Sequence, residues 1–219
     1  MEIPLFPLPT LVLFPNVLIP LHIFEERYKL MISQCIASKE AFGLLLLRDG
    51  ADEESEQSIH RIGSTARIVQ ADTLPDGRMN ILCRSEARFR ILRFTQRAPY
   101  WKGSIDFFDD EEPQADLSEL QARVTGLWLE GVRLGVELGA AEPQEETAFP
   151  DSPQAVSFAL AYISELTPEQ KQELLEMTST RKRLSALAEL FEAAILDLGK
   201  QIAKKALNRK VGGNGFLPH

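Results

Sequence analysis

The chain has 219 residues, of which 44% are hydrophobic and 26% are charged, as is typical of globular proteins. Its formal net charge of −8 disfavours general nucleic-acid binding, because neutralising phosphates requires a basic surface. The first residues lack the basic and apolar segments of a signal peptide, and no apolar run is long enough to span a bilayer. We therefore expect a cytoplasmic protein with no membrane partner.

The first 28 residues alternate between apolar stretches and prolines. Prolines at positions 4, 7, 9, 15 and 20 exclude a long helix and divide any strand into short pieces. Leu11 to Phe14 and Val17 to Ile19 have the composition of strands. After Phe24 the apolar residues recur at a spacing of three and four, which predicts an amphipathic helix of about three turns.

The segment from residue 42 to residue 108 predicts a β-rich fold. Phe42 to Leu47 is a continuous apolar run typical of a buried strand. Ile62 to Ala71 and Met79 to Cys83 flank Leu74-Pro75-Asp76-Gly77, whose residue types suit a hairpin turn. Alternating patterns continue to Phe108, so we expect a small, strongly coiled sheet that resembles a barrel and carries one helix.

Helical signals dominate after the acidic run at 109–112. Apolar residues between 120 and 138 keep a helical period, and the glycines at 131, 135 and 139 share one face, which indicates a close neighbour or an early helix end. Ser152-Pro153 opens a further helix. Thr167-Pro168-Glu169-Gln170 is a capping box with proline in the first turn. A long last helix is expected from Thr180 to Leu207.

Three separated motifs resemble the N-terminal domain of the Lon protease family. The first is the opening, with Leu5-Phe6-Pro7-Leu8, Phe14-Pro15-Asn16 and Ile19-Pro20-Leu21-His22-Ile23-Phe24. The second comprises Ile62 to Ile68 with Leu74 to Arg78, and the third comprises Leu174 to Met177 followed by Arg183-Leu184. The resemblance implies a PUA-like sheet and a stand-alone form of the domain, without the ATPase and protease modules of full-length Lon.

The motifs of common catalytic and cofactor sites are absent from the sequence. There is no phosphate-cradling glycine loop and no Cys-x-x-Cys or histidine pair at metal-ligand spacing, and Ser179 is interpreted as a helix cap. Cys35 and Cys83 are interpreted as small buried hydrophobic residues. We therefore expect a protein that is not an enzyme, with no catalytic residue, no cofactor and no metal site.

Aromatic residues in the β-rich half are the main candidates for binding. Tyr100, Trp101, Phe107 and Phe108 occur as adjacent pairs, and a strand points alternate side chains to opposite faces. One ring of each pair is therefore expected to face away from the core and to contact an extended peptide beside a sheet edge. By resemblance, the ligand is an unfolded or specific protein, as in substrate recognition during protein quality control.

RNA binding is the alternative function. Five arginines lie between Arg84 and Arg97, and three of them, Arg84, Arg88 and Arg90, share parity on a regular strand. PUA-like sheets also occur in RNA-modifying proteins, and Tyr100 or Trp101 could stack on bases. The net charge and the acidic run disfavour this alternative, so nucleic acid is not the expected partner.

The sequence therefore predicts an α+β protein in three parts. A β-rich, PUA-like subdomain spans residues 1–112, an α-helical subdomain that ends in a long helix spans residues 113–207, and a flexible tail spans residues 208–219. The chain is expected to bind protein or peptide ligands, and its oligomeric state stays open.

Overall fold

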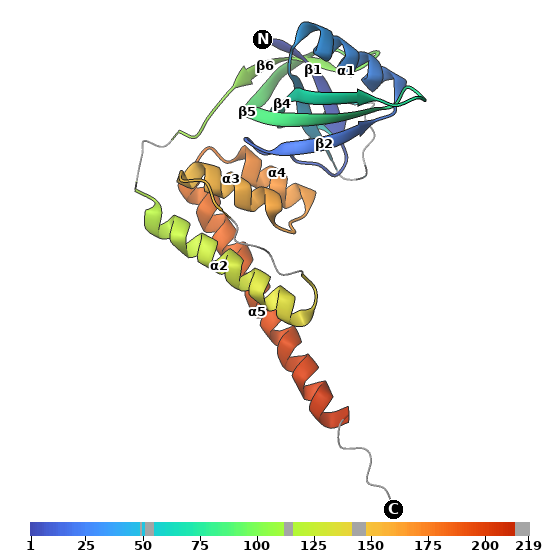
Figure 1. Ribbon diagram of the computed structural model, residues 1–219. Helices are drawn as coiled ribbons and strands as arrows, with labels where there is room; N and C mark the ends of the chain where they lie inside the picture. Colours follow the sequence, from blue (N-terminus) through green and yellow to red (C-terminus); the bar gives the residue numbers. More distant parts are fainter. Residues whose placement is uncertain (49, 51–54, 112–115, 142–147, 213–219) are drawn as a thin grey trace, which may run out of the picture. The chain divides into compact units, whose positions relative to one another are not determined.

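The computed structural model describes residues 1–48, 50, 55–111, 116–141 and 148–212, with side chains up to residue 205 (Figure 1). Two compact units divide the chain. The sheet unit comprises Met1–Glu112 and Ala161–Ser179, and the helical unit comprises Pro113–Leu160 and Thr180–His219. The chain therefore passes from one unit to the other three times.

Six strands form the sheet of the first unit. In chain order they are β1 (Glu2–Leu8), β2 (Leu18–Ile23), β3 (Phe42–Leu47), β4 (Ile59–Thr73), β5 (Met79–Gln96) and β6 (Lys102–Phe107). The order across the sheet is β2-β5-β4-β3-β1-β6, and β6 also pairs with β5. Five strands thus close on themselves, because β5 is long enough to pair with β2 through its first half and with β6 through its second.

The expected hairpin is present, and its two strands are longer than the segments that the sequence predicts. β4 and β5 pair antiparallel from Ile62–Arg90 to Thr73–Met79, and Gly77 has φ +82° in the turn between them. Register shifts near Ala66 and Gln70 interrupt the ladder, and such bulges increase the local bend of a strand. Figure 1 shows these two long strands side by side, and their bends help the sheet to close.

One buried apolar cluster of the sheet unit lies between the strands and α1 (Glu26–Ser38), and another is formed without α1. Tyr28, Met31, Ile32 and Cys35 form the buried stripe of α1, at the three- and four-residue spacing that the sequence predicts. They pack against Phe6 and other buried residues of the strands. Each large apolar side chain moved out of water contributes about 1.5–3 kcal/mol to folding, so this stripe holds α1 on the sheet.

Residues 161–179 complete the sheet unit, although the sequence places them in the helical subdomain. They include α4 (Pro168–Glu176), which begins at the predicted capping box: Thr167 accepts from the Gln170 amide, and Gln170 caps the Thr167 amide in return. Gln172 Nε2 donates to the main-chain oxygen of Ile62 in β4 at 3.0 Å. These contacts, and those of Arg88 described below, explain why a helical segment belongs with the strands.

The helical unit contains α2 (Ser118–Leu138), most of α3 (Pro153–Ile163) and α5 (Thr180–Gly212). α2 ends at Gly139, which has φ +76°, so this glycine terminates the helix as expected. A Cβ on Gly135 would lie 3.2 Å from the Ala141 Cβ, whereas a Cβ on Gly131 would meet nothing within 4 Å. The three glycines therefore form no common contact face.

The last helix is longer than the sequence predicts. It starts at Thr180 as expected but ends at Gly212 rather than Leu207, so the first five residues of the predicted tail are helical, and residues 213–219 lie outside the described residues. Lys205 Nζ donates to the main-chain oxygen of Leu138 at the end of α2. Among the described helices, none combines the length and the apolar run that crossing a membrane requires.

Candidate functional site

Tyr100 and Trp101 are both buried, with 3% and 4% of their surfaces exposed. The expectation that one ring of this pair faces away from the core is wrong, because β6 begins only at Lys102 and the pair does not follow a regular strand. The Tyr100 hydroxyl donates to Gln34 Oε1 in α1, and burial raises the pKa of Tyr100. Tyr100 is therefore part of the packing between the sheet and α1.

Phe107, the last residue of β6, and Phe108, which follows it, lie in a different environment. Phe107 is 47% exposed, whereas Phe108 is half-buried with the guanidinium groups of Arg88 and Arg90 at 4.6 Å and 5.3 Å from its ring centre. Neither residue lines the two hollows described next. The four aromatic candidates thus do not come together in one site.

An apolar hollow of about 750 Å³ lies beside the β2–α1 junction. It combines buried rings with one prominent exposed ring: Phe6 and Tyr28 are buried, and Phe24 is 61% exposed. His22 stacks near Phe24 with 6.2 Å between ring centres, and its Nδ1 shares a hydrogen bond of 2.7 Å with Asn80 Oδ1. The remaining lining residues are Leu8, Pro9, Ile23, Glu25, Arg27, Leu47, Arg97, Ala98, Pro99 and Trp101.

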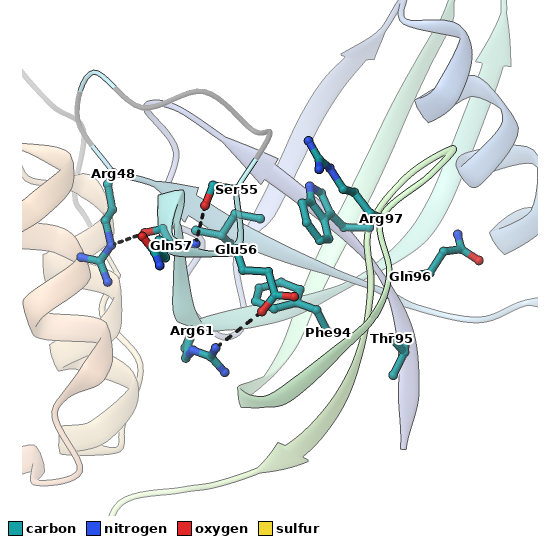
Figure 2. A pocket seen from close by; sticks show the side chains of 11 residues that line it. Arg48, Ser55, Glu56, Gln57, Arg61, Phe94, Thr95, Gln96 and Arg97 are labelled. Atoms are coloured by element: carbon teal, nitrogen blue, oxygen red, sulfur yellow. Dashed lines mark hydrogen bonds and ion pairs between the residues drawn. The ribbon is translucent and has the colours of Figure 1, made fainter.

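A second hollow, of about 720 Å³, is rimmed by arginines. Arg48, Arg61 and Arg97 project from three different segments around it (Figure 2). Arg48 Nε donates to the main-chain oxygen of Gln57 at 3.0 Å, and the Arg61 guanidinium lies 3.9 Å from the Glu56 carboxylate. We call this the arginine hollow; its other lining residues are Ser55, Ile59, Phe94, Thr95, Gln96 and Trp101.

Arg97 and Trp101 line both hollows, so the two are neighbours on the sheet unit. The Arg97 guanidinium lies 5.9 Å from the centre of the Trp101 ring, and the Phe94 ring packs against Trp101 with 5.1 Å between centres. Trp101 thus forms the shared wall of an apolar and a basic depression. This arrangement suits a ligand that carries both apolar and polar or anionic groups.

Reactive groups do not gather at either hollow in the described part of the chain. No three metal-binding side chains cluster among the described residues. His60 lies outside the hollows, with its Nδ1 3.5 Å from the Glu176 carboxylate; burial and the charge of Arg48 lower its pKa. Cys35 and Cys83 are free and buried, and burial raises their pKa values to about 11 and about 12.

Arg88 is not accessible to a ligand, which corrects the predicted RNA-binding set. Its side chain is only 1% exposed. Its Nη1 donates to the main-chain oxygens of Leu175 and Met177 at 2.9 Å and 2.6 Å, and its Nη2 lies 2.6 Å from the carboxylate of Asp110, itself 6% exposed. Arg84 and Arg90 are exposed; RNA binding through these two stays a prediction.

The acidic run at 109–112 contains the buried ion-pair partner of Arg88. A run of acidic residues suggests a solvated loop, but Asp110 is the buried partner of Arg88. The neighbouring amide of Glu111 donates to the main-chain oxygen of Thr178 at 2.8 Å. Residues 110 and 111, which follow β6, therefore contact β5 and the segment that follows α4, all within the same unit.

Sequence reasoning missed the two hollows because their walls come from distant segments. Phe6, Phe24 and Trp101 belong to an aromatic-rich half of the sequence, but only closure of the sheet brings residues 6–9, 22–28 and 97–101 together. The one local signal is Phe24, a large apolar residue placed exactly where the strand pattern changes into the helix pattern. The arginine hollow has no comparable signal.

A family model described as the ATP-dependent protease La (LON) substrate-binding domain matches residues 2–193. The Lon protease of Methylocella silvestris is 28% identical over 200 residues, which cover 89% of this chain and 24% of that protein. The Lon protease of Flavobacterium johnsoniae is 27% identical over 186 residues, covering 83% of this chain and 23% of that protein. The chain thus spans about a quarter of the length of these curated relatives.

Solved structures share the fold. A Lon N-terminal domain protein from Xanthomonas campestris superposes with a TM-score of 0.61 at 26% identity, covering 85% of this chain and 96% of that one. The N-terminal domain of the Lon protease of the Mycobacterium avium complex superposes with a TM-score of 0.66 at 18% identity, covering 88% and 98%. Both have the mixed architecture described above, with a sheet followed by helices.

Proposed function

Because the chain belongs to the family of LON substrate-binding domains, we propose that it is a non-catalytic receptor for unfolded polypeptide segments. The observation that carries the proposal is the apolar hollow, which is lined by the exposed ring of Phe24 and by the buried rings of Phe6 and Tyr28. The Phe24 ring is 61% exposed beside a concave apolar surface, so this apolar surface remains in contact with water until a ligand covers it. An apolar side chain of an extended segment would be buried there.

The setting of the hollow suits an extended ligand. β2 leads directly into it, and among the described strands β2 pairs only with β5. An extended segment beside such an edge can combine main-chain hydrogen bonds with side chains placed in pockets. Pro20 within β2 lacks a main-chain donor, so we propose that the pockets supply most of the affinity.

The proposed biological setting is protein quality control in the cytoplasm. In this role the receptor holds an unfolded segment and performs no chemistry on it. The described residues around the hollows offer charge, hydrogen bonds and apolar surface, which are properties of a binding site.

Hydrogen exchange tests this proposal. Reduced, carboxymethylated α-lactalbumin serves as the unfolded ligand, and the native form of the same protein is the control. We expect protection at residues 6–9, 22–28 and 97–101 with the unfolded form only. Protection confined to other segments, or equal protection by native α-lactalbumin, would contradict the proposal.

A matched pair of variants assigns the effect to the hollow. Phe24 and Leu92 are both exposed side chains of the sheet unit, at 61% and 58%, but only Phe24 lines the apolar hollow. We expect Phe24→Ala to weaken binding about tenfold, as loss of a buried aromatic anchor does, and Leu92→Ala to leave it unchanged. Equal weakening by both variants would remove the hollow from the site.

A further inference from the structure

The described lining of the arginine hollow carries more positively than negatively charged side chains. The chain carries a net charge of −8, yet the described lining of this hollow has three arginines, Arg48, Arg61 and Arg97, and one carboxylate, that of Glu56. Acidic residues 49 and 52–54 fall outside the described residues, so the comparison concerns the described lining. Guanidinium groups gathered around one depression can bind anionic groups there.

Aromatic rings support two of these guanidinium groups. Arg61 lies 5.5 Å from the centre of the Phe94 ring, and Arg97 lies 5.9 Å from that of Trp101. At these distances a ring attracts a guanidinium and favours positions in which the two groups stay together. The two arginines are therefore partly ordered before a ligand arrives.

The arginine hollow is also continuous with the apolar hollow through Arg97 and Trp101. A ligand that reaches from one to the other needs an apolar side chain at one end and an anionic group a few residues away. Carboxylates of aspartate and glutamate match arginine with paired hydrogen bonds, which are stronger than those between neutral groups.

We propose that this protein selects extended peptide segments in which a large apolar side chain is followed or preceded within a few residues by acidic side chains. The apolar side chain occupies the apolar hollow, and the carboxylates contact Arg61 and Arg97, with Arg48 at the far rim. This inference rests on the proposed function and adds the class of segment that the site prefers.

Two dye-labelled peptides test the preference by fluorescence anisotropy with the full chain. Each is a 12-residue glycine–serine peptide with one Phe-Leu pair, followed after one residue by two aspartates in the first peptide and by two asparagines in the second. We expect the aspartate peptide to bind about tenfold more tightly at low salt, and the preference to shrink as salt rises, because exposed ion pairs are screened.

Variants locate the preference on the arginine hollow. We expect the double variant Arg61→Gln/Arg97→Gln to abolish the preference for aspartate while the asparagine peptide binds as before. Arg84→Gln/Arg93→Gln is the matched control, because both arginines are exposed on the same strand and neither lines the hollow; this variant should keep the preference.

The outcomes separate the two proposals. Equal binding of both peptides overturns the acidic preference and leaves the apolar receptor in place. No binding of either peptide overturns both. If a single-stranded RNA oligonucleotide binds more tightly than the aspartate peptide and loses affinity in the Arg61/Arg97 variant, the hollow serves nucleic acid, and the peptide preference is overturned.

Discussion

The sheet unit and the helical unit each bury an arginine, but the two side chains join segments at very different separations along the chain. Arg88 links β5 to Asp110, Leu175 and Met177, which lie 22, 87 and 89 residues away. Arg183 donates to Ser157 Oγ, 26 residues away, and to Thr180 Oγ1 in its own first helical turn, and its guanidinium lies 4.0 Å from the Phe158 ring centre.

This difference reflects how the two units are built. The helical unit brings together a few segments by side-chain packing, and Arg183 satisfies groups close to it. The sheet unit brings a late segment of the chain, around α4, against the much earlier strand β5. Arg88 of β5 donates to the main-chain oxygens at the end of α4. A fully buried guanidinium is stable only when its donors are bound, so Arg88 makes closure of the sheet unit depend on residues 175–177.

The largest effect should come from removing the Arg88 guanidinium. Arg88→Met removes the guanidinium that pairs with the buried carboxylate of Asp110, and breaking such a buried pair typically costs about 3–5 kcal/mol. Each unit has one tryptophan, Trp101 or Trp128, so a Trp128→Phe background reports on the sheet unit and a Trp101→Phe background on the helical unit. We expect urea unfolding to show a loss of this size at Trp101 and a much smaller one at Trp128.

Two further variants act as controls for Arg88. Adding Asp110→Asn to Arg88→Met should recover part of the lost free energy of unfolding, because the buried charge is gone. Arg90→Met changes an exposed arginine beside the same Phe108 ring and should cost less than about 1 kcal/mol. A loss below 1 kcal/mol for Arg88→Met would mean that the buried ion pair does not hold the unit closed.

Replacing a glycine by alanine should have opposite effects on the stability of the two units. A Cβ on Gly63 in β4 would lie 2.2 Å from the main-chain oxygen of Leu44 and 2.8 Å from Leu45 Cδ2, so Gly63→Ala must push β3 and β4 apart. We expect it to lower the free energy of unfolding of the sheet unit by about 3 kcal/mol, at the upper end of ordinary overpacking. Thermal and urea unfolding followed at Trp101 measure this loss, and an unchanged midpoint would contradict it.

Gly131 in α2 should respond with the opposite sign. A Cβ there meets nothing within 4 Å, and alanine is favoured over glycine inside a helix by roughly 0.5–1 kcal/mol. Gly131→Ala should therefore raise the free energy of unfolding of the helical unit by this amount, measured at Trp128. A destabilising result would indicate that Gly131 has a role outside the contacts described for the helical unit.

His60 should contribute the smallest effect, a pH dependence of the sheet unit. Burial and Arg48 lower its pKa below the ordinary 6.5, so below about pH 6.5 the unfolded state binds a proton that the native state resists. Stability is therefore lost as the pH falls through this range, and no contribution remains above it. His60→Gln should flatten the slope of unfolding free energy between pH 7 and pH 5; an unchanged slope would exclude His60 as its source.

Local patterns allowed much of the fold to be predicted. β3, the capping box at Thr167, the start of α5 at Thr180 and the stripe on α1 all depend on residues within a few positions of one another. The burial of Arg88 and Asp110 did not follow from such patterns, because alternation along a strand says which face a side chain is on and nothing about what later covers that face. The hollows escaped prediction for the same reason.

The three passages of the chain between the units also set an order of events during synthesis. Residues 1–112 leave the ribosome about 70 residues before the segment 161–179 that completes the same unit. At roughly 5–20 residues per second, the nascent strands wait for several seconds with the Arg88 site unfilled and Gln172 not yet made. During that interval α2 and most of α3 emerge, whereas α5 is made only after residue 179. A protein proposed here to receive unfolded chains therefore itself presents an incomplete sheet unit to chaperones while it is being made.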